Sequence, residues 1–336
     1  MHRFSIFFLF ILISCSSNNS ERIYTGFFDH DKQPVAERTF RDGPEPYHVL
    51  NFSEMELFRP GNLEHNDTHL FLTDFAEQAV IKISKKNPQD VQVFRLSEGK
   101  GPGEVLSVQG FAVNNERIVV GDQSNKRLVV LDTNGNHLQD VPVKFNPTNI
   151  RLTDDNRVTS FSPIQQPYLF MIYSPEGDSL GGFGPPEPGI ESSMKYTGYF
   201  RYADGNIFVA GYSESLIRKY NIDGDVLFSR STIDDYDTTG NYENRSTDQF
   251  RAFGFSDDAL FSTRQLAVYG NFLYLIPHHN GDSSRKFTDL YNAENGTYKE
   301  SLHLDVFARD LVADEQHLYI LANVDDEATL RFYSRH

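Results

Sequence analysis

The stretch Arg117-Ile-Val-Val-Gly-Asp122 begins the unit that decides the fold class. A short polar loop, a second apolar run to Asp132 and the turn Thr133-Asn-Gly135 follow it. This unit of strand, loop, strand and glycine turn recurs about six times after residue 65. The corresponding first strands of the other units are His69–Asp74, Arg157–Phe161, Asn206–Ala210, Phe272–Ile276 and His317–Leu321. Their starts lie about 40 to 65 residues apart, which is the period of β-propeller blades and not of helical solenoids.

The turns repeat as the strands do. Val130-Leu-Asp-Thr-Asn-Gly135 aligns with the turns that contain Gly177 and Gly224 and, more loosely, with the turn at Gly296. A glycine at a fixed point between two strands supplies the positive φ of a tight hairpin. The Asp and Asn residues of these turns also suggest calcium loops, but no turn has the full spacing with a bidentate Glu at position twelve. We therefore interpret the turns as hairpins.

The last unit provides only three strands, the third being Thr329–His336, whereas a propeller blade needs four. A strand from the other end of the chain can complete such a blade and leave no open sheet edge. Val35–Arg41 alternates apolar and polar side chains, so we expect it to be that strand. The predicted fold is all-β: a single six-bladed β-propeller over residues 31–336, with four-stranded antiparallel blades and an insertion at about 232–262.

The first residues have the pattern of an export signal. A brief basic start precedes about ten apolar residues, which are too few to span a bilayer. Leu12-Ile-Ser-Cys15 resembles the lipobox of bacterial lipoproteins, so we expect residues 1–15 to be a lipoprotein signal peptide with Cys15 lipidated. Residues 16–30 would then be a tether. This predicts an outer-membrane lipoprotein of the bacterial cell envelope, facing the periplasm or the cell surface; a cleaved secretory signal with an incidental Cys is the alternative.

Composition narrows the partners and the chemistry. The formal net charge is −16, which argues against nucleic acid and anionic lipid surfaces, since both favour an excess of Lys and Arg. Cys15 is the only cysteine, so its lipidation leaves no thiol for a disulfide, a nucleophile or a sulfur metal site. We expect a monomer that contacts the membrane only through its lipid anchor.

A glycine-rich turn carries a family resemblance. The stretch Glu98-Gly-Lys-Gly-Pro-Gly-Glu104, together with the repeat over roughly residues 45–336, resembles six-bladed propellers of the NHL and TolB type, specifically a group of envelope lipoproteins. The chain has no Trp, which speaks against propellers of the WD type. The resemblance implies the fold and the envelope location, but most members of this group lack an assigned activity. A phosphate-binding loop is not indicated, because Pro102 removes a backbone donor and no helix follows.

Candidate binding residues gather on one face of the predicted ring. The loops between the second and third strands of each blade, and the links between blades, share that face. Asp122 and the pair His278-His279 belong to such loops, and Arg201, Arg264 and Arg309 fall early in the inner strands of three successive blades. The three arginines could hold a carboxylate or sulfate group in the channel, or could bond backbone carbonyls between blades. The histidines could ligate a metal or act as a base, but no carboxylate lies at metal spacing, so we favour a solvated loop pair.

No linear motif of a zinc protease, serine hydrolase or Rossmann enzyme is present. We therefore expect a non-catalytic, lipid-anchored module that binds a glycan, peptide or partner protein on its loop face, with no cofactor. Aromatic residues of the insertion, among them Tyr236, Tyr242, Phe250, Phe253 and Phe255, could contact such a ligand or cover a blade edge. The alternative is a calcium-dependent hydrolase or lactonase with its metal in the central channel, where several blades would supply oxygen ligands that no linear motif reveals. A third hypothesis is a docking disc within an envelope complex.

Overall fold

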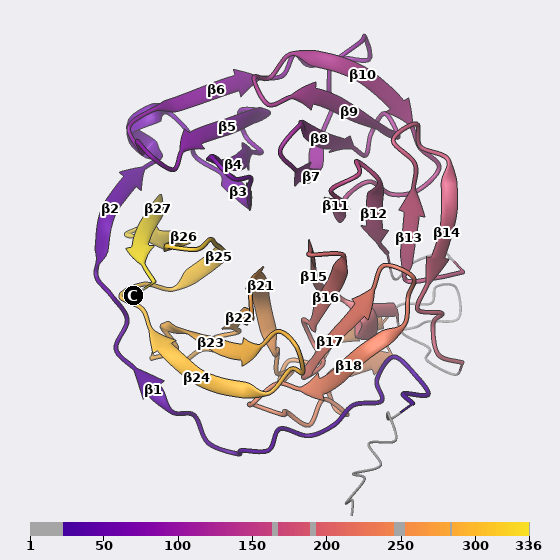
Figure 1. Cartoon of the computed structure of the whole chain (residues 1–336), viewed down its shortest axis with the longest axis vertical. Coiled ribbons are helices and arrows are strands. Elements are labelled where there is room, and N and C mark those ends of the chain that lie inside the picture. Colours follow the sequence, from indigo (N-terminus) through magenta and orange to yellow (C-terminus); the bar gives the residue numbers. More distant parts are fainter. Residues whose placement is uncertain (1–22, 163–166, 189–192, 245–252, 283, 336) are drawn as a thin grey trace, which may run out of the picture.

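The computed structural model describes residues 23–162, 167–188, 193–244, 253–282 and 284–335. Six blades, each of four antiparallel strands, stand around a central axis and form a closed ring, and one blade carries a fifth, short strand at its outer edge (Figure 1). The predicted six-bladed all-β fold is therefore confirmed. Cys15, the predicted signal peptide and the tether as far as residue 22 lie outside the described residues, as does Phe250 of the insertion.

Each blade runs from an inner strand outward through antiparallel neighbours. Blade 1 is β3 (Pro60–His65), β4 (His69–Asp74), β5 (Ala79–Ser84) and β6 (Val91–Arg95). Blade 2 is β7 (Val108–Val113), β8 (Arg117–Asp122), β9 (Arg127–Asp132) and β10 (His137–Pro142). Blade 3 is β11 (Ile150–Leu152), β12 (Val158–Phe161), β13 (Phe170–Tyr173) and β14 (Ser179–Phe183).

The second half of the ring repeats this order. Blade 4 is β15 (Gly198–Ala203), β16 (Asn206–Gly211), β17 (Leu216–Asn221) and β18 (Val226–Ser231). Blade 5 is β21 (Thr263–Tyr269), β22 (Phe272–Pro277), β23 (Phe287–Asn292) and β24 (Tyr298–His303). Blade 6 is β25 (Ala308–Ala313), β26 (His317–Val324), β27 (Glu327–Ser334) and β2 (Pro46–Asn51).

The apolar stretches of the repeat are the second strands of the six blades, β4, β8, β12, β16, β22 and β26. They are apolar on both faces because each is covered by a neighbouring blade on either side. Leu72 and Ile81 of blade 1, for example, pack in one buried cluster with Tyr319 and Leu321 of blade 6. The aligned turn glycines have φ values of 83°, 89°, 95° and 71° at Gly135, Gly177, Gly224 and Gly296, as the hairpin interpretation predicts.

The two faces of the ring differ in their connections. Hairpins between the first and second strands, and between the third and fourth, lie on one face, which we call the hairpin face. Loops between the second and third strands, and the links between blades, lie on the opposite face, which we call the loop face. All inner strands begin at the loop face and end at the hairpin face.

The ring closes with a different strand from the one predicted. β2 pairs antiparallel with β27, so Leu50 lies opposite Leu330 and completes blade 6. Val35–Arg41 is not this strand: only Phe40–Arg41 (β1) is extended, and it adds in parallel to the outer edge of blade 5. The prediction of closure by an N-terminal strand is thus confirmed, while its position along the chain was wrong.

Residues 23–45 form a strap around the outside of the ring, which Figure 1 shows passing blades 4 and 5 before β2. Phe27 is buried against blades 3 and 4, so the predicted tether does not extend to residue 30. Arg218 of blade 4 donates hydrogen bonds to the carbonyls of Gly26 and Asp29 at 2.8 and 2.6 Å. Arg38 pairs with Asp289 at 2.9 Å and with Asp234 at 2.7 Å, which fixes the strap on blade 5.

The insertion between blades 4 and 5 forms a small hairpin, β19 (Tyr242–Asn244) with β20 (Phe253–Phe255). The Tyr242 hydroxyl contacts Ser213 and Glu214 at 2.7 Å, so the hairpin covers the loop between the second and third strands of blade 4. No helix among the described residues is long and apolar enough to cross a membrane.

Candidate functional site: the central channel and its two mouths

Arg201 closes the middle of the channel. It extends from β15 of blade 4 and pairs with Glu64 of blade 1 at 2.5 Å and with Asp310 of blade 6 at 3.1 Å. Its remaining donors reach the carbonyls of Leu63 and Leu266, at 3.3 and 3.0 Å. One side chain therefore bonds to three other blades, which is the structural role that the sequence left open for the arginines.

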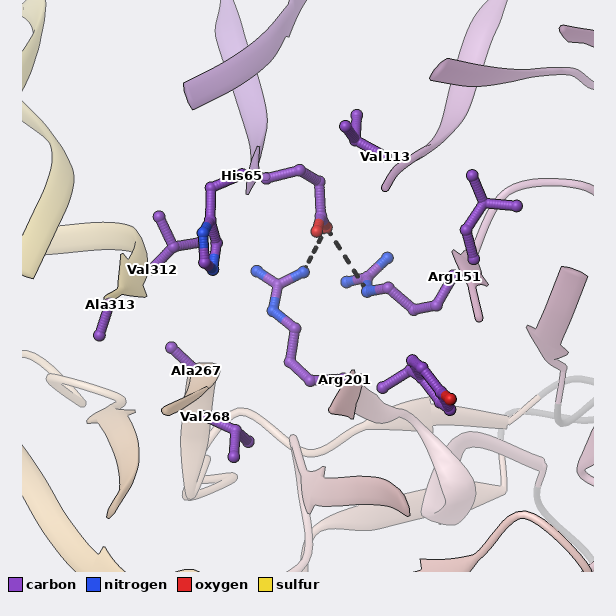
Figure 2. Close-up of a pocket in the computed structure, with 11 residues that line it drawn as sticks. His65, Val113, Arg151, Arg201, Ala267, Val268, Val312 and Ala313 are labelled. Carbon is purple, nitrogen blue, oxygen red and sulfur yellow. Dashed lines mark hydrogen bonds and ion pairs between the residues drawn. The ribbon is translucent and has the colours of Figure 1, made fainter. Parts of the chain in front are cut away.

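A second arginine shares the same carboxylate. Figure 2 shows the guanidinium groups of Arg151 and Arg201 converging, and Arg151 Nε lies 3.5 Å from Glu64 Oε1. Burial, with the repulsion of Arg201 added, lowers the pKa of Arg151 to about 10 although Glu64 opposes the shift. Burial raises the pKa of Asp310 in spite of Arg201. Two carboxylates and two guanidinium groups thus balance one another in the channel centre.

Arg264 and Arg309 lie nearer the loop face and have no carboxylate partner among the residues that the structure describes. Each occupies the second position of its inner strand, at a β-bulge that shifts the register of blade 5 or blade 6. Such bulges redirect a side chain away from the regular sheet pattern. Arg309 donates to the neutral acceptors Asn323 Oδ1 (2.6 Å) and Pro60 O (3.3 Å), and Arg264 has no hydrogen bond or ion pair within the described part of the chain. Burial and the nearby Arg264 lower the pKa of Arg309.

Aromatic rings and both histidines border these arginines. The His278 ring lies 5.1 Å from Phe261 and stacks on His279 at 5.0 Å, and the His279 ring is 5.9 Å from Phe307. Burial lowers the pKa of His278, and His279, Arg264 and Arg285 add to that shift. His278 is therefore neutral at pH 7. We call the end of the channel around Arg264, Arg309, His278 and His279 the loop-face mouth. It contains these four of the six predicted binding residues.

Asp122 belongs to the scaffold of a loop. Its carboxylate is fully buried and accepts hydrogen bonds from Leu106 N at 3.0 Å and Asn125 Nδ2 at 2.6 Å. These bonds hold the link that contains the Glu98–Glu104 turn, and Arg127 adds hydrogen bonds to the carbonyls of Gly101 and Glu104. The turn is structural, as the sequence indicated, and the fully buried carboxylate of Asp122 is not exposed to a ligand.

Three cavities lie toward the hairpin face. A cavity of about 90 Å³ beneath Arg201 leads to one of about 420 Å³ formed by the hairpins of blades 1 to 5, and a third of about 540 Å³ extends toward blade 6. His65 lines all three. Sequence reasoning directed attention to the loop face and missed these residues. The sequence feature that could have pointed to them is the set of polar hairpins that follow the inner strands, such as His65-Asn-Asp67 and Val113-Asn-Asn115.

A polar network in the third cavity joins blade 1 to blade 6. Lys85 pairs with Asp314 at 3.0 Å and donates a hydrogen bond to His65 Nδ1 at 3.0 Å, while the Tyr319 hydroxyl donates to Asp314 at 2.8 Å. Burial, together with Lys85, lowers the pKa of His65 to about 4. Burial alone would raise the pKa of Asp314, but Lys85 and the Tyr319 hydrogen bond lower it to about 2. His65 is therefore neutral with its proton on Nε2.

Among the residues that the structure describes, no group of three or more His, Cys, Asp or Glu side chains is arranged to hold a metal ion. The channel carboxylates Glu64 and Asp310 are each engaged by Arg201. Among the described residues, the His278 and His279 rings form hydrogen bonds with Asn280 and Gly281 and not with a carboxylate. The metal-ligand and base roles, which the sequence raised as alternatives to a solvated loop pair, gain no support from these partners.

The fold is shared with several solved structures. A Bacteroides fragilis protein described as exported matches with a TM-score of 0.59 at 10% identity, covering 91% of this chain and 98% of that one. A member of the DUF4221 family from Bacteroides vulgatus matches with a TM-score of 0.52 at 11% identity, covering 89% and 97%. The structure of U3-55K matches with a TM-score of 0.53 at 11% identity, covering 86% and 99%. At these identities the likeness shows the fold alone.

No protein-family model matches the sequence, and no curated protein matches it.

Proposed function

We propose that this chain is a lipid-anchored β-propeller of the bacterial cell envelope that binds, without catalysis, a ligand bearing a carboxylate or sulfate group at its loop-face mouth. The ligand would be a glycan, a peptide or a segment of a partner protein. The observation that carries the proposal is that Arg264 and Arg309 lie close together and that, within the described residues, neither forms a hydrogen bond or ion pair with a carboxylate. The nearby Asp310 opposes only part of the decrease in the pKa of Arg309.

Two arginines without a carboxylate partner in the described part of the chain are unusual in a protein that is strongly acidic overall. The net charge is −16, yet within the described residues these two guanidinium groups have no carboxylate partner. Placing two cations near each other at a partly buried site is unfavourable unless an anion joins them. Guanidinium groups bind carboxylates and sulfates through paired, charge-assisted hydrogen bonds, so an anionic ligand would relieve the repulsion. Tyr199 and His278 beside Arg264 add neutral donors.

The proposed location rests on the sequence. The lipobox at Cys15 supports lipid anchoring, and the Glu98–Glu104 turn supports membership of the NHL and TolB type of envelope lipoproteins. The similar fold of the exported Bacteroides fragilis protein is consistent with an envelope location. The protein would be a monomer that contacts the membrane only through its lipid, exposed either to the periplasm or to the cell surface.

Calorimetry with defined anions tests the proposal. The probes are a trigalacturonate, a sulfated heparin disaccharide and a short peptide with a free C-terminal carboxylate. We expect at least one to bind, with Arg264→Gln and Arg309→Gln each weakening it about tenfold or more, which corresponds to about 1.4 kcal/mol. Arg95→Gln is the matched control, because Arg95 lies on the exposed outer strand of blade 1. Equal binding by all three variants would refute the site.

Two further measurements address the rest of the proposal. Cys15→Ser should release the protein from the membrane fraction of the expressing cells, because no acyl chain could then be attached. Thermal unfolding with calcium and with a chelator tests for a resident metal, since a ligand that binds only the folded state raises its stability. A melting temperature that falls with chelator and recovers with calcium would favour the hydrolase alternative.

A further inference from the structure

The second cavity on the hairpin face has the size and the lining of a small-molecule site. Its volume of about 420 Å³ lies within the range of ligand pockets in proteins, roughly 300–1,000 Å³. The hairpins of blades 1 to 5 each contribute residues to it, so the ring itself holds its walls in place. It is separated from Arg264 and Arg309 by Arg201 and its ion pairs.

The lining presents acceptors and donors at the same time. Asp67, Asp154 and Asp204 supply carboxylates, and Asp67 already accepts a hydrogen bond from Asn115 Nδ2 at 2.9 Å. Asn66 supplies an amide, and His65 supplies a neutral imidazole whose Nδ1 accepts from Lys85. Asp154 is held by the Tyr202 hydroxyl at 3.3 Å. Asp204 has no side-chain hydrogen bond within the described residues, so its carboxylate is available to a ligand.

The apolar side chains of the lining lie at the inner end of the cavity. The side chains of Val113, Leu152 and Val268 line the inner part of the cavity, because they also border the narrow space beneath Arg201. Tyr202 and Tyr269 add two aromatic residues. Aromatic side chains at a binding site offer an apolar face and, in Tyr, a polar end.

Charge narrows the ligand class. The lining contains no Lys or Arg, so it has no group to balance an anion. An organic cation would satisfy the carboxylates but would leave the Asn66 amide donor without an acceptor, and unpaired donors cost binding energy. A ligand with several hydroxyl groups and an apolar C–H face meets both requirements, because each hydroxyl both donates and accepts.

We propose that this hairpin-face cavity binds a neutral saccharide, either one sugar ring or the terminal ring of an oligosaccharide. The site is separate from the loop-face mouth and does not depend on the function proposed for Arg264 and Arg309. The ring would lie against Tyr269 and the aliphatic wall, with its hydroxyls bonded to Asp204, Asp154 and His65.

Calorimetry and saturation-transfer NMR on the full chain test this site. The protein is purified in a detergent without a sugar head group, and the probes are neutral hexoses, 6-deoxyhexoses, pentoses, N-acetylhexosamines and their common disaccharides. We expect at least one sugar to bind with one site per chain. Asp204→Gly should weaken it about tenfold or more and leave the fold intact, because Asp204 has a φ of +49°, where Gly is well tolerated. Tyr269→Leu should also weaken binding while keeping an apolar side chain.

Matched controls separate this site from the other mouth. Asp223 is an exposed carboxylate in the outer turn of blade 4, the blade that also carries Asp204. Asp223→Ala should leave sugar binding unchanged, as should Arg264→Gln. Failure of the whole panel to bind would overturn the proposal. So would a sugar whose affinity falls with Arg264→Gln but not with Asp204→Gly. Binding of choline or putrescine that Asp204→Gly abolishes, without any sugar binding, would reassign the cavity to organic cations and equally overturn it.

Discussion

The two mouths of the channel are built by the same inner strands and differ in charge. At the loop face, Arg309 bonds only to neutral acceptors and Arg264 has no polar partner among the described residues. The second cavity on the hairpin face has carboxylates and no Lys or Arg in its lining. Arg201 lies between them, neutralised by Glu64 and Asp310. The two mouths therefore differ in charge, and the carboxylates around each arginine separate the structural Arg201 from the two arginines for which we propose a binding role.

The largest expected effect tests this distinction among the arginines. Arg201→Met removes the cation that balances Glu64 and Asp310 and leaves two carboxylates buried without it. Loss of one partner of a buried ion pair destabilises a protein by about 3–5 kcal/mol. Urea denaturation followed by fluorescence should show a decrease of this size for Arg201→Met. Arg264→Gln should change stability by about 0.5 kcal/mol or less, as is usual for a substitution without such partners.

Similar losses in both variants would contradict the distinction. It would mean that Arg264 also balances a buried carboxylate and is part of the scaffold.

The next effect concerns the pH dependence of stability at the hairpin face. Because burial and Lys85 lower the pKa of His65 to about 4, the unfolded chain binds a proton at this residue more readily than the folded chain. The contribution of His65 is therefore complete above about pH 6.5 and is lost as pH falls toward 4. At about 1.4 kcal/mol per pKa unit, the loss is about 2–3 kcal/mol. His65→Gln keeps a neutral acceptor for Lys85 and should show a smaller decrease between pH 7 and 4.5.

Asp314, Lys85 and Arg201 also act on His65, so the difference between wild type and variant is the informative quantity. Parallel stability curves for the two proteins over this pH range would show that His65 is not the group that titrates.

The smallest expected effect is a pH dependence of ligand affinity at the loop-face mouth. His278 is neutral at pH 7, and Arg264, Arg285 and His279 oppose its protonation. An anion bound beside Arg264 would favour the protonated ring, so affinity should increase as pH falls. We expect the trigalacturonate or peptide affinity to rise about threefold between pH 7 and 5.5, which is the size of a screened charge interaction of under 1 kcal/mol. His278→Gln should flatten this dependence, whereas an unchanged profile in the variant would place the ligand away from His278.

The repeat was predictable from the sequence because it is local. The second strand of most blades has a run of consecutive apolar residues, such as Ile118–Val120, and the turn glycines need a positive φ that few other residues adopt. The identity of the closing strand depends on contacts that are distant in the sequence. Val35–Arg41 alternates as β2 does, but its Arg38 is directed to Asp234 and Asp289, and no pattern within the segment reveals those partners.

The site was less predictable for the same reason. Arg201, Arg264 and Arg309 occupy similar places in their strands, yet Glu64 is 137 residues from the arginine that it neutralises. The position of the two histidines, Arg264 and Arg309 on the loop face was predictable, because the strand order alone places their loops and strand starts there. The hairpin-face cavity was missed because its Asn and Asp residues have the composition of ordinary turns, and their convergence depends on the ring.

The pairing of β2 with β27 has a consequence for biosynthesis. Leu50 is among the first residues of the propeller to be synthesised and Leu330 among the last, yet they are neighbours in one sheet. A nascent chain must therefore keep the edge of blade 6 unformed until almost the entire polypeptide has emerged, and contacts of such long sequence separation form slowly. During this interval the unpaired edges of the incomplete ring are open to other chains. Truncation near the C-terminus would thus leave the whole ring open, and not merely shorten its last blade.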